Sequence, residues 1–239
     1  MGESIEKDDQ PRARAWDGLH EAAFEILCRH APPPRRLWDI GCGQGAFSKL
    51  ALEAGYLVHA LDGEMMQCRV PGVQCHSLDL NDSVEVEHFI HSHGGRADVT
   101  VALEIIEHLR NPWAFIQFCA QMTKPDGCIL LSTPHIESIY SRLLFLHTGQ
   151  FLMFRDYRKP YGHINPMTTA ELETIFDYFH LSIGVKTFPC KMPVYGSMRH
   201  HLGVLASSII RPFVKGNTEG IILMYLLRKQ AAVSGDRST

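Results

Sequence analysis

The sequence has no C-x-x-C pair, although it contains seven cysteines among its 239 residues. An odd number of thiols without that spacing excludes a disulfide framework and a zinc ribbon, and it predicts reduced, intracellular cysteines. The chain also lacks an apolar run of the roughly 18 residues that a membrane-spanning helix needs. Residues 202–214 come nearest, but Arg211 and Pro212 interrupt them. The first fifteen residues are charged and lack the apolar segment of a secretory signal, so we expect a cytoplasmic protein, free or peripheral on a membrane.

Neither sign of charge dominates the chain. It has 23 Lys and Arg against 26 Asp and Glu, a net charge of −3, which argues against a nucleic-acid-coating protein, so nucleic acid is not an expected partner. Hydrophobic residues make up 45% of the chain, enough for a buried core. At roughly 150 residues per domain, the length predicts a single domain. We place this domain at residues 16–230, between a disordered tail at 1–15 and a frayed tail at 231–239.

Helical and strand patterns alternate along the chain. Helical periodicity occupies residues 16–31, 46–54, 84–91, 112–122 and 168–179, and strand patterns occupy residues 37–40, 56–61, 73–78, 98–103, 128–133, 181–188 and 220–227. This alternation predicts an α/β fold in which a parallel sheet carries helices on both faces. Residues 135–165 and 189–217 interrupt the alternation, and we expect them to form insertions over the carboxyl edge of the sheet, where active sites of this fold class lie.

A glycine-rich turn follows the first strand and opens a helix. In the sequence Asp39-Ile-Gly-Cys-Gly-Gln-Gly-Ala46, the glycines allow a ligand to approach the backbone, and the helix amino terminus offers free N–H groups. Asp62, at the end of the second strand, is placed to accept hydrogen bonds from ribose hydroxyls, so the pattern fits a nucleoside ligand. Gly41-x-Gly43-x-x-Ala46 also satisfies the permissive dinucleotide fingerprint. Asp39 discriminates between the two, because a carboxylate there suits a ligand ammonium better than a pyrophosphate; a capping role for Asp39 is the structural alternative.

An ordered series of motifs resembles the class I S-adenosylmethionine-dependent methyltransferases. The matching segments are LWDIGCGQGAFSKLA, VHALDGEMM, HSLDLND, VTVALEIIEHLRNPWAF and MTKPDGCILLSTPH, within residues 36–135. The resemblance is strongest to the ubiquinone-pathway O-methyltransferase subgroup. It implies a Rossmann-like, doubly wound, mostly parallel seven-stranded sheet with helices on both faces and an antiparallel last strand.

The same resemblance implies S-adenosyl-L-methionine as the cofactor and a set of residues that bind it. Asp39 and the glycine turn would hold the methionine part, Asp62 the ribose, and Asp79 with the backbone of Leu80 the adenine. Met65 or Met66 would pack on the adenine, although a methionine there also suits a plain core position. The implied cofactor-binding residues are Asp39, Gly41, Gly43, Gly45, Asp62, Met65, Asp79, Leu80 and Glu104.

The segment Glu104-Ile-Ile-Glu107-His108 follows the fourth strand directly. If a helical turn begins there, the spacing puts Glu104 on one face with Glu107 and His108. A capping and solvating role for Glu107 and His108 is the alternative. The Glu-x-x-Glu-His pattern also resembles one in ubiquinone-pathway and small-RNA 2′-O-methyltransferases, in which a later histidine completes a divalent cation site. By that resemblance Glu104, Glu107, His108 and His163 would ligate magnesium, manganese or zinc. Without a cation, His163 or His108 is the expected catalytic base, and a structural role for His163 in its loop stays open.

The segment around the two insertions is basic, whereas the rest of the chain is acidic. Residues 140–217 contain nine Lys and Arg against four Asp and Glu, so they carry +5 while the remainder carries −8. This pattern favours an anionic or amphipathic acceptor, a membrane surface or a protein partner. Residues 140–155 are apolar enough to form a lid, and residues 195–215 could form a membrane-surface helix or a dimer contact; packing on the chain's own domain is the alternative for both. Either a monomer or a homodimer fits.

These observations predict an enzyme that methylates an oxygen of a small-molecule or lipid-linked acceptor by in-line transfer. The chain has no Asp/Asn-Pro-Pro-Tyr motif after the fourth strand, which would indicate transfer to nitrogen, although nothing in the sequence forces oxygen. A metal-dependent RNA 2′-O-methyltransferase is the alternative within the enzyme class. A catalytically idle cofactor-binding or assembly protein is the alternative outside it.

Overall fold

The order of the strands across the sheet defines the fold. The computed structural model describes residues 11–63, 68, 70–154, 162–191 and 209–230. Seven strands form one sheet in the order β3-β2-β1-β4-β5-β7-β6, in which β7 runs antiparallel to its neighbours β5 and β6 and the other pairs are parallel. The strands are β1 (Arg36–Ile40), β2 (Leu57–Asp62), β3 (Gln74–Ser77), β4 (Ala97–Leu103), β5 (Thr123–Pro134), β6 (Leu181–Thr187) and β7 (Ile222–Lys229). The predicted fold class, including the antiparallel last strand, is confirmed.

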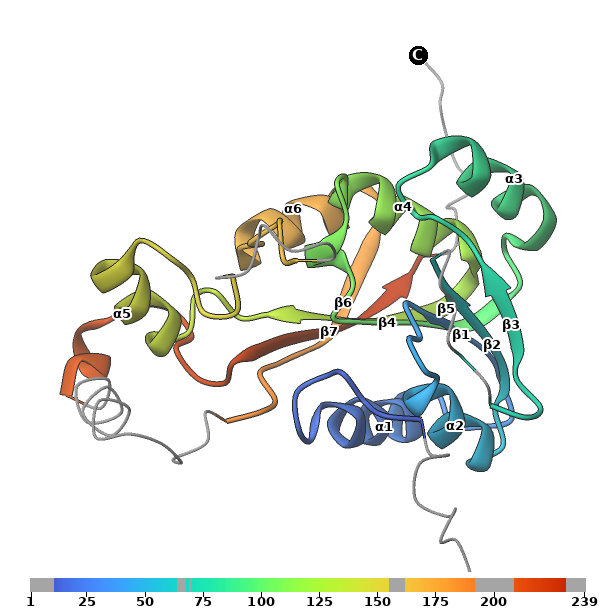
Figure 1. Cartoon of the computed structure of the whole chain (residues 1–239), viewed down its shortest axis with the longest axis horizontal. Coiled ribbons are helices and arrows are strands. Elements are labelled where there is room, and N and C mark those ends of the chain that lie inside the picture. Colours follow the sequence, from blue (N-terminus) through green and yellow to red (C-terminus); the bar gives the residue numbers. More distant parts are fainter. Residues whose placement is uncertain (1–10, 64–67, 69, 155–161, 192–208, 231–239) are drawn as a thin grey trace, which may run out of the picture.

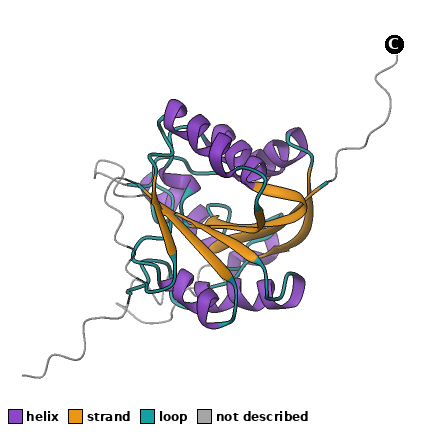
Figure 2. Cartoon of the chain, turned by 90° about the vertical axis from the view of Figure 1, so that its right-hand side faces the viewer, coloured by secondary structure: helices purple, strands orange, loops and turns teal. Residues whose placement is uncertain are grey.

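Helices cover both faces of this sheet, as Figures 1 and 2 show. One face carries α1 and α2, and the other carries α3, α4 and α6. The helices are α1 (Leu19–His30), α2 (Ala46–Glu53), α3 (Ser83–His93), α4 (Pro112–Met122), α5 (Ile139–Thr148) and α6 (Thr169–Tyr178), with short 3₁₀ helices η1 (Ile106–His108) and η2 (Arg211–Phe213). Side chains that accept from first-turn N–H groups cap four of them: Asp82, Asn111, Ser138 and Thr168.

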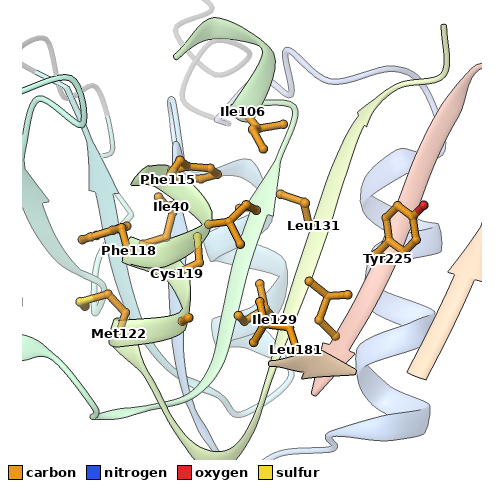
Figure 3. Packing of buried hydrophobic residues seen from close by; sticks show 14 of the residues in the cluster. Ile40, Ile106, Phe115, Phe118, Cys119, Met122, Ile129, Leu131, Leu181 and Tyr225 are labelled. Carbon is orange, nitrogen blue, oxygen red and sulfur yellow. The ribbon is translucent and has the colours of Figure 1, made fainter. Parts of the chain in front are cut away.

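The alternation of side chains along each strand divides the core into two clusters. On β1, Leu37 packs toward α1 and α2, whereas Trp38 packs toward α3 and α4. Figure 3 shows Phe115 and Phe118 of α4 packed over the sheet. Both faces of the central strands are buried, so these strands appear in the sequence as continuous apolar runs. This is why the positions of the central strands can be predicted from the sequence. β5 starts at Thr123, earlier than predicted, because Thr123 pairs with Ala97.

The first of the two interruptions contains a helix, α5, where the sequence has no clear helical pattern. The Ser138 hydroxyl caps its start, and Gly149, at φ 71°, ends it in the left-handed conformation. α5 lies beyond the carboxyl end of β5 (Figure 1). Residues 155–161 and 192–208 of the two interruptions lie outside the described residues, as do residues 1–10 and 231–239, so the domain limits and tails stay predictions. None of the described helices has the length and apolar content needed to span a bilayer.

Candidate functional site

The glycine turn after β1 adopts a backbone conformation that favours glycine at each of its three glycines. Gly41, Gly43 and Gly45 have φ of 76°, 53° and 88°. A Cβ at Gly45 would lie 2.7 Å from the Sγ of Cys68, so this position also has no room for a side chain. Apart from its two chain neighbours, a Cβ at Gly43 would meet no atom of the described residues within 4 Å. The turn therefore presents an open backbone surface at Gly43, directly before α2.

Asp39 is almost fully buried at the carboxyl end of β1. It shares the α2 face of the sheet with Leu37, and the Ser48 hydroxyl of α2 donates to its Oδ2 at 2.6 Å. Burial raises the pKa of Asp39 to about 6; the Ser48 hydrogen bond opposes this shift, and nearby Asp62 adds to it. A buried carboxylate with one hydroxyl partner is suited to pair with a cationic group of a ligand.

Asp62 connects the turns after β1 and β2. Its Oδ2 accepts from the Gly43 N–H at 2.6 Å, and its Oδ1 accepts from the Gly63 N–H at 2.8 Å. Each carboxylate oxygen can accept a second hydrogen bond, so these contacts orient the group without using its full capacity. Asp62 can therefore accept from the hydroxyls of a ligand bound over Gly43.

The turn after β3 brings two more of the predicted residues to the same edge of the sheet. The half-buried Asp79 accepts from the Asn81 N–H at 2.9 Å, and Leu80 packs against the core. The Asn81 side chain accepts from the Arg110 N–H at 2.9 Å, which joins this turn to the segment after β4. Met65 and Met66 lie outside the described residues, so their predicted contact with adenine stays a prediction.

Glu104 is the first residue after β4 and is half-buried in a left-handed conformation, at φ 53°. Its backbone N–H donates to the Ser132 hydroxyl at 3.1 Å, and the same hydroxyl donates to its Oε1 at 2.9 Å. Burial raises the pKa of Glu104 to about 7, against the opposing effect of the Ser132 hydrogen bond. The strained backbone and the paired hydrogen bonds fix this carboxyl group at the edge of the sheet.

Glu107 is completely buried in η1. Its Oε2 accepts from the Thr133 hydroxyl at 3.1 Å, whereas its Oε1 has no hydrogen-bond partner among the described residues. Burial and, second, the neighbouring Glu104 raise the pKa of Glu107 well above its ordinary value. The Glu107 carbonyl accepts from the N–H groups of Ile164 and Asn165 at 2.8 and 3.0 Å, so the loop that carries His163 is attached to η1.

Glu107, His108 and His163 come together, although His163 is distant from the other two in sequence. Each of the three has a potential ligand atom within 4.8 Å of the others. The two imidazole rings meet edge to face with centroids 4.6 Å apart, and the buried Nδ1 of His163 has no hydrogen-bond partner among the described residues. Burial and, second, His108 lower the pKa of His163 to about 4. One carboxyl group and two imidazoles form a donor set suited to a divalent cation, and the two unpartnered buried atoms fit that role.

A helical turn begins at Ile106, two residues after Glu104, and Glu104 lies outside the group of three. β5 explains the separation, because Ser132 shares the sheet face of Leu130 and Thr133 shares the opposite face with Leu131. Ser132 therefore holds Glu104 on one side, and Thr133 holds Glu107 on the other. The condition for placing Glu104 on one helical face with Glu107 and His108, a turn that begins at Glu104, is therefore not met. A ligand role for Glu104 stays a prediction.

A family model described as a methyltransferase domain matches residues 9–183 of the chain. The chain belongs to this methyltransferase family. The turn after β1, the acidic residue at the end of β2 and the Glu-His segment after β4 all lie within the matched part of the methyltransferase domain. The resemblance predicted from the sequence is confirmed at the level of the family.

Curated relatives of the methyltransferase domain include two enzymes named ubiquinone biosynthesis O-methyltransferase. The one from Xanthomonas campestris pv. campestris is 33% identical over 113 residues, which cover 45% of this chain and 46% of the relative. The one from Escherichia coli O7:K1 is 31% identical over 149 residues, which cover 55% of this chain and 60% of the relative. The match thus spans about half the length of these relatives. A solved S-adenosylmethionine-dependent methyltransferase from Archaeoglobus fulgidus has the same fold, with a TM-score of 0.60, 21% identity and coverage of 88% and 94% of the two chains.

Several residues that organise the site of this methyltransferase domain were not predicted. They are Ser48, Ser132, Thr133 and Phe154, which contact Asp39, Glu104, Glu107 and His163 respectively. A signal existed for Ser132 and Thr133, because two hydroxyl residues end the apolar run Cys-Ile-Leu-Leu at the carboxyl edge. Ser48 and Phe154 carry no such signal, since their partners are brought to them only by the tertiary fold.

Proposed function

We propose that this protein transfers the methyl group of S-adenosyl-L-methionine to an oxygen atom of a small-molecule or lipid-linked acceptor. The observation that carries the proposal is the contact between the glycine turn and the segment after β4. A Cβ at Gly41 would lie 3.0 Å from the Ile105 side chain, between Glu104 and Glu107 in sequence. The turn suited to a nucleoside cofactor and the group suited to a hydroxyl acceptor therefore lie next to each other, as an in-line transfer requires.

On the cofactor side, the chain's own groups match the parts of S-adenosylmethionine. Asp39 would pair with the ammonium group, Asp62 would accept from the ribose hydroxyls, and Asp79 with the Leu80 N–H would hold the adenine. The open space at Gly43 fits a ligand that lies directly on the backbone. The bound cofactor supplies a sulfonium-linked methyl group, so the protein has to align the acceptor and exclude water.

On the acceptor side, Glu107, His108 and His163 would handle the proton of the acceptor hydroxyl. The unpartnered Glu107 Oε1 and His163 Nδ1 support a divalent cation held by these three residues. Such a cation lowers the pKa of a hydroxyl group next to it. In the absence of a cation, His163 or His108 would accept the proton directly.

The same three residues favour one second candidate, the metal-dependent methylation of a ribose 2′-hydroxyl in RNA. The net charge of −3 weighs against it, because RNA binding depends on Lys and Arg that contact phosphates. The names of the relatives from Xanthomonas campestris and Escherichia coli support an O-directed transfer to a small molecule. We therefore favour the small-molecule or lipid-linked acceptor.

Transfer of a labelled methyl group into three separate pools tests the proposal. The purified protein would be incubated with labelled S-adenosylmethionine and a lipid extract, a small-molecule extract or total RNA. We expect label in an extractable lipid or small molecule, as a base-stable ether. Label in RNA would support the second candidate. Binding of the cofactor, on the order of micromolar, without transfer into any pool would indicate a catalytically idle protein, and binding of NADH instead would restore the dinucleotide interpretation of the glycine turn.

A further inference from the structure

Three histidines that the proposed function does not use lie together at the β3 edge of the sheet. His59 is on β2, His76 on β3 and His93 at the end of α3, which lies beside β3 in Figure 1. The centroid of the His76 ring is 5.7 Å from that of His59 and 5.1 Å from that of His93. All three residues are half-buried. Three elements of the chain thus bring their imidazole rings into one histidine cluster.

Aromatic side chains pack around the histidine cluster. The Trp38 ring of β1 stacks on His59 at a centroid distance of 4.6 Å, with 14° between the ring planes. Phe89 of α3 stacks on His93 at 4.3 Å and meets His76 edge to face at 5.6 Å. His93 Nδ1 lies 3.2 Å from the Phe89 carbonyl oxygen, which can only accept. In the neutral His93 ring Nδ1 is therefore the donor, and Nε2 carries the lone pair.

The rings of His59 and His76 are neutral at pH 7. Burial lowers the pKa of His59 to about 4, with smaller contributions in the same direction from His76, Arg36 and His93. Burial and, second, His93 lower the pKa of His76. Metal ions bind the neutral form of imidazole. At neutral pH the histidine cluster therefore offers lone pairs instead of positive charges.

Two nitrogen atoms of the histidine cluster face each other. His59 Nδ1 and His76 Nε2 are 3.5 Å apart, and the tautomers decide which of them carries a proton. This distance exceeds the roughly 2.7–3.2 Å of an ordinary hydrogen bond from nitrogen to oxygen. It matches two ligands of one metal ion, because nitrogens bound at about 2.0–2.1 Å to a tetrahedral ion lie about 3.4 Å apart. When the protons are on His59 Nε2 and His76 Nδ1, two lone pairs face this gap.

We propose that the histidine cluster binds a divalent transition-metal ion, with His59 Nδ1 and His76 Nε2 as its first two ligands. Imidazole nitrogen suits zinc, nickel and copper, whereas magnesium and calcium prefer oxygen. The site goes beyond the proposed function, because none of its ligands belongs to the proposed cofactor or acceptor side. A bound ion would join β2 to the edge strand β3 and so stabilise the folded chain.

His93 is placed to become the third ligand. Two imidazole rings bound to one tetrahedral ion have centroids about 5 Å apart, close to the 5.1 Å between His76 and His93. Among the described residues, three ligand atoms lie within 4.8 Å of one another only at the group of Glu107, His108 and His163, so His93 must shift toward the ion. An open cavity of about 430 Å³ between α3 and the turn after β3 reaches His93, and water in it can complete the coordination.

Metal titration of the untagged full-length protein tests the site. The His163→Ala variant is used beside the wild type, because it removes one ligand of the group that includes Glu107. At neutral pH we expect NiCl₂ to quench the fluorescence of Trp38 in both proteins, because the Trp38 ring stacks on a ligand of the ion. ZnCl₂ should bind both proteins in calorimetry and raise the unfolding temperature of both.

Variants of the histidine cluster, made in the His163→Ala background, assign the ligands. His59→Gln and His76→Gln should each lower the affinity for zinc at least about tenfold, since the loss of a residue that only orients a ligand already costs about 10–100-fold. His93→Gln should have a smaller effect, because His93 has to shift before it can bind. His91→Gln is the matched control, because His91 is exposed on the same helix as His93, and it should bind zinc like the background protein.

The variant Trp38→Phe locates the ion, because it should lose the quenching by nickel and keep the binding of zinc. Three outcomes would overturn the site: no binding of either ion in the His163→Ala background, equal zinc affinity in His59→Gln and His91→Gln, or nickel quenching that persists unchanged in Trp38→Phe. Methyl transfer does not enter these measurements, so failure of the metal site and failure of the proposed function can be told apart.

Discussion

The proposed cofactor side and the proposed acceptor side of the site differ in how their buried polar groups are hydrogen-bonded. On the cofactor side, Asp39 and Asp62 accept short hydrogen bonds from the chain's own hydroxyl and N–H groups. On the acceptor side, Glu107 Oε1 and His163 Nδ1 are buried without a partner among the described residues. Leaving a buried polar atom unpaired costs about 1–3 kcal/mol. The residues of the proposed cofactor side are therefore held by the protein itself, whereas the unpartnered atoms of the proposed acceptor side are available to the proposed cation.

The largest expected effect is on the cofactor side, from Gly43→Val. A Cβ at Gly43 would meet no atom of the described residues beyond its chain neighbours, but the side chain would occupy the space over the turn. We therefore expect cofactor binding to be lost while the fold persists. Gly149→Val is the matched control, because Gly149 also has a positive φ, of 71°, and open space around its Cβ. Both variants carry the left-handed strain of about 1–2 kcal/mol, so they should unfold at similar temperatures. Calorimetry in which Gly43→Val binds S-adenosylmethionine like the wild type would reject the cofactor site.

The second largest effect is expected on the acceptor side, from removal of the proposed cation. A chelator should stop turnover with little change in cofactor affinity, and added magnesium, manganese or zinc should restore it. His163→Ala should lower turnover by about 10²- to 10⁴-fold and remove the response to the chelator, because one ligand of the group is lost. Turnover that is unaffected by chelation but falls in His163→Ala would assign His163 as a base. A variant that loses stability but keeps turnover per folded molecule would leave only a structural role for this histidine.

The two sides also differ in how far their residues could be predicted from the sequence. Asp39, Gly43 and Asp62 act through local geometry, a strand end followed by a turn, and their spacing is visible in the chain. Glu107 and His163 meet because the loop of His163 is hydrogen-bonded to the Glu107 carbonyl, a tertiary contact that has no local signal. The position of Glu104 has the same origin, because Ser132 on the neighbouring strand is hydrogen-bonded to it and it adopts a left-handed conformation that helical spacing does not anticipate.

The pH dependence of cofactor affinity tests the role of Asp39 on the cofactor side. The pKa of Asp39 is raised to about 6, so the carboxylate is ionised at pH 7 and protonated at pH 5. Pairing with the cofactor ammonium then requires loss of that proton, and the affinity should fall by up to about tenfold per pH unit below pH 6. Asp39→Asn should bind more weakly at pH 7 and show a shallower profile below pH 6, where Glu104, with a pKa of about 7, still titrates. Calorimetry that finds the same slope in both proteins would exclude Asp39 as the ammonium partner.

The smallest expected effects come from the two neighbouring hydroxyls of β5, which serve opposite sides of the comparison. Ser132→Ala removes the donor to Glu104, and Thr133→Val removes the donor to Glu107. Each loss should cost about 0.5–1.5 kcal/mol, roughly 2- to 12-fold in the affected constant. We expect Ser132→Ala to weaken cofactor binding with little change in chelator response, and Thr133→Val to lower turnover and raise the cation concentration needed for activity. The two variants are neighbours on β5, and each removes one hydrogen bond from a hydroxyl to a carboxyl group. Identical effects of the two variants on cofactor affinity would mean that Glu104 and Glu107 do not have separate functions. If Ser132→Ala affects cofactor binding and Thr133→Val affects turnover, then the alternation of side chains along β5 places cofactor binding on one face of the sheet and acceptor chemistry on the other.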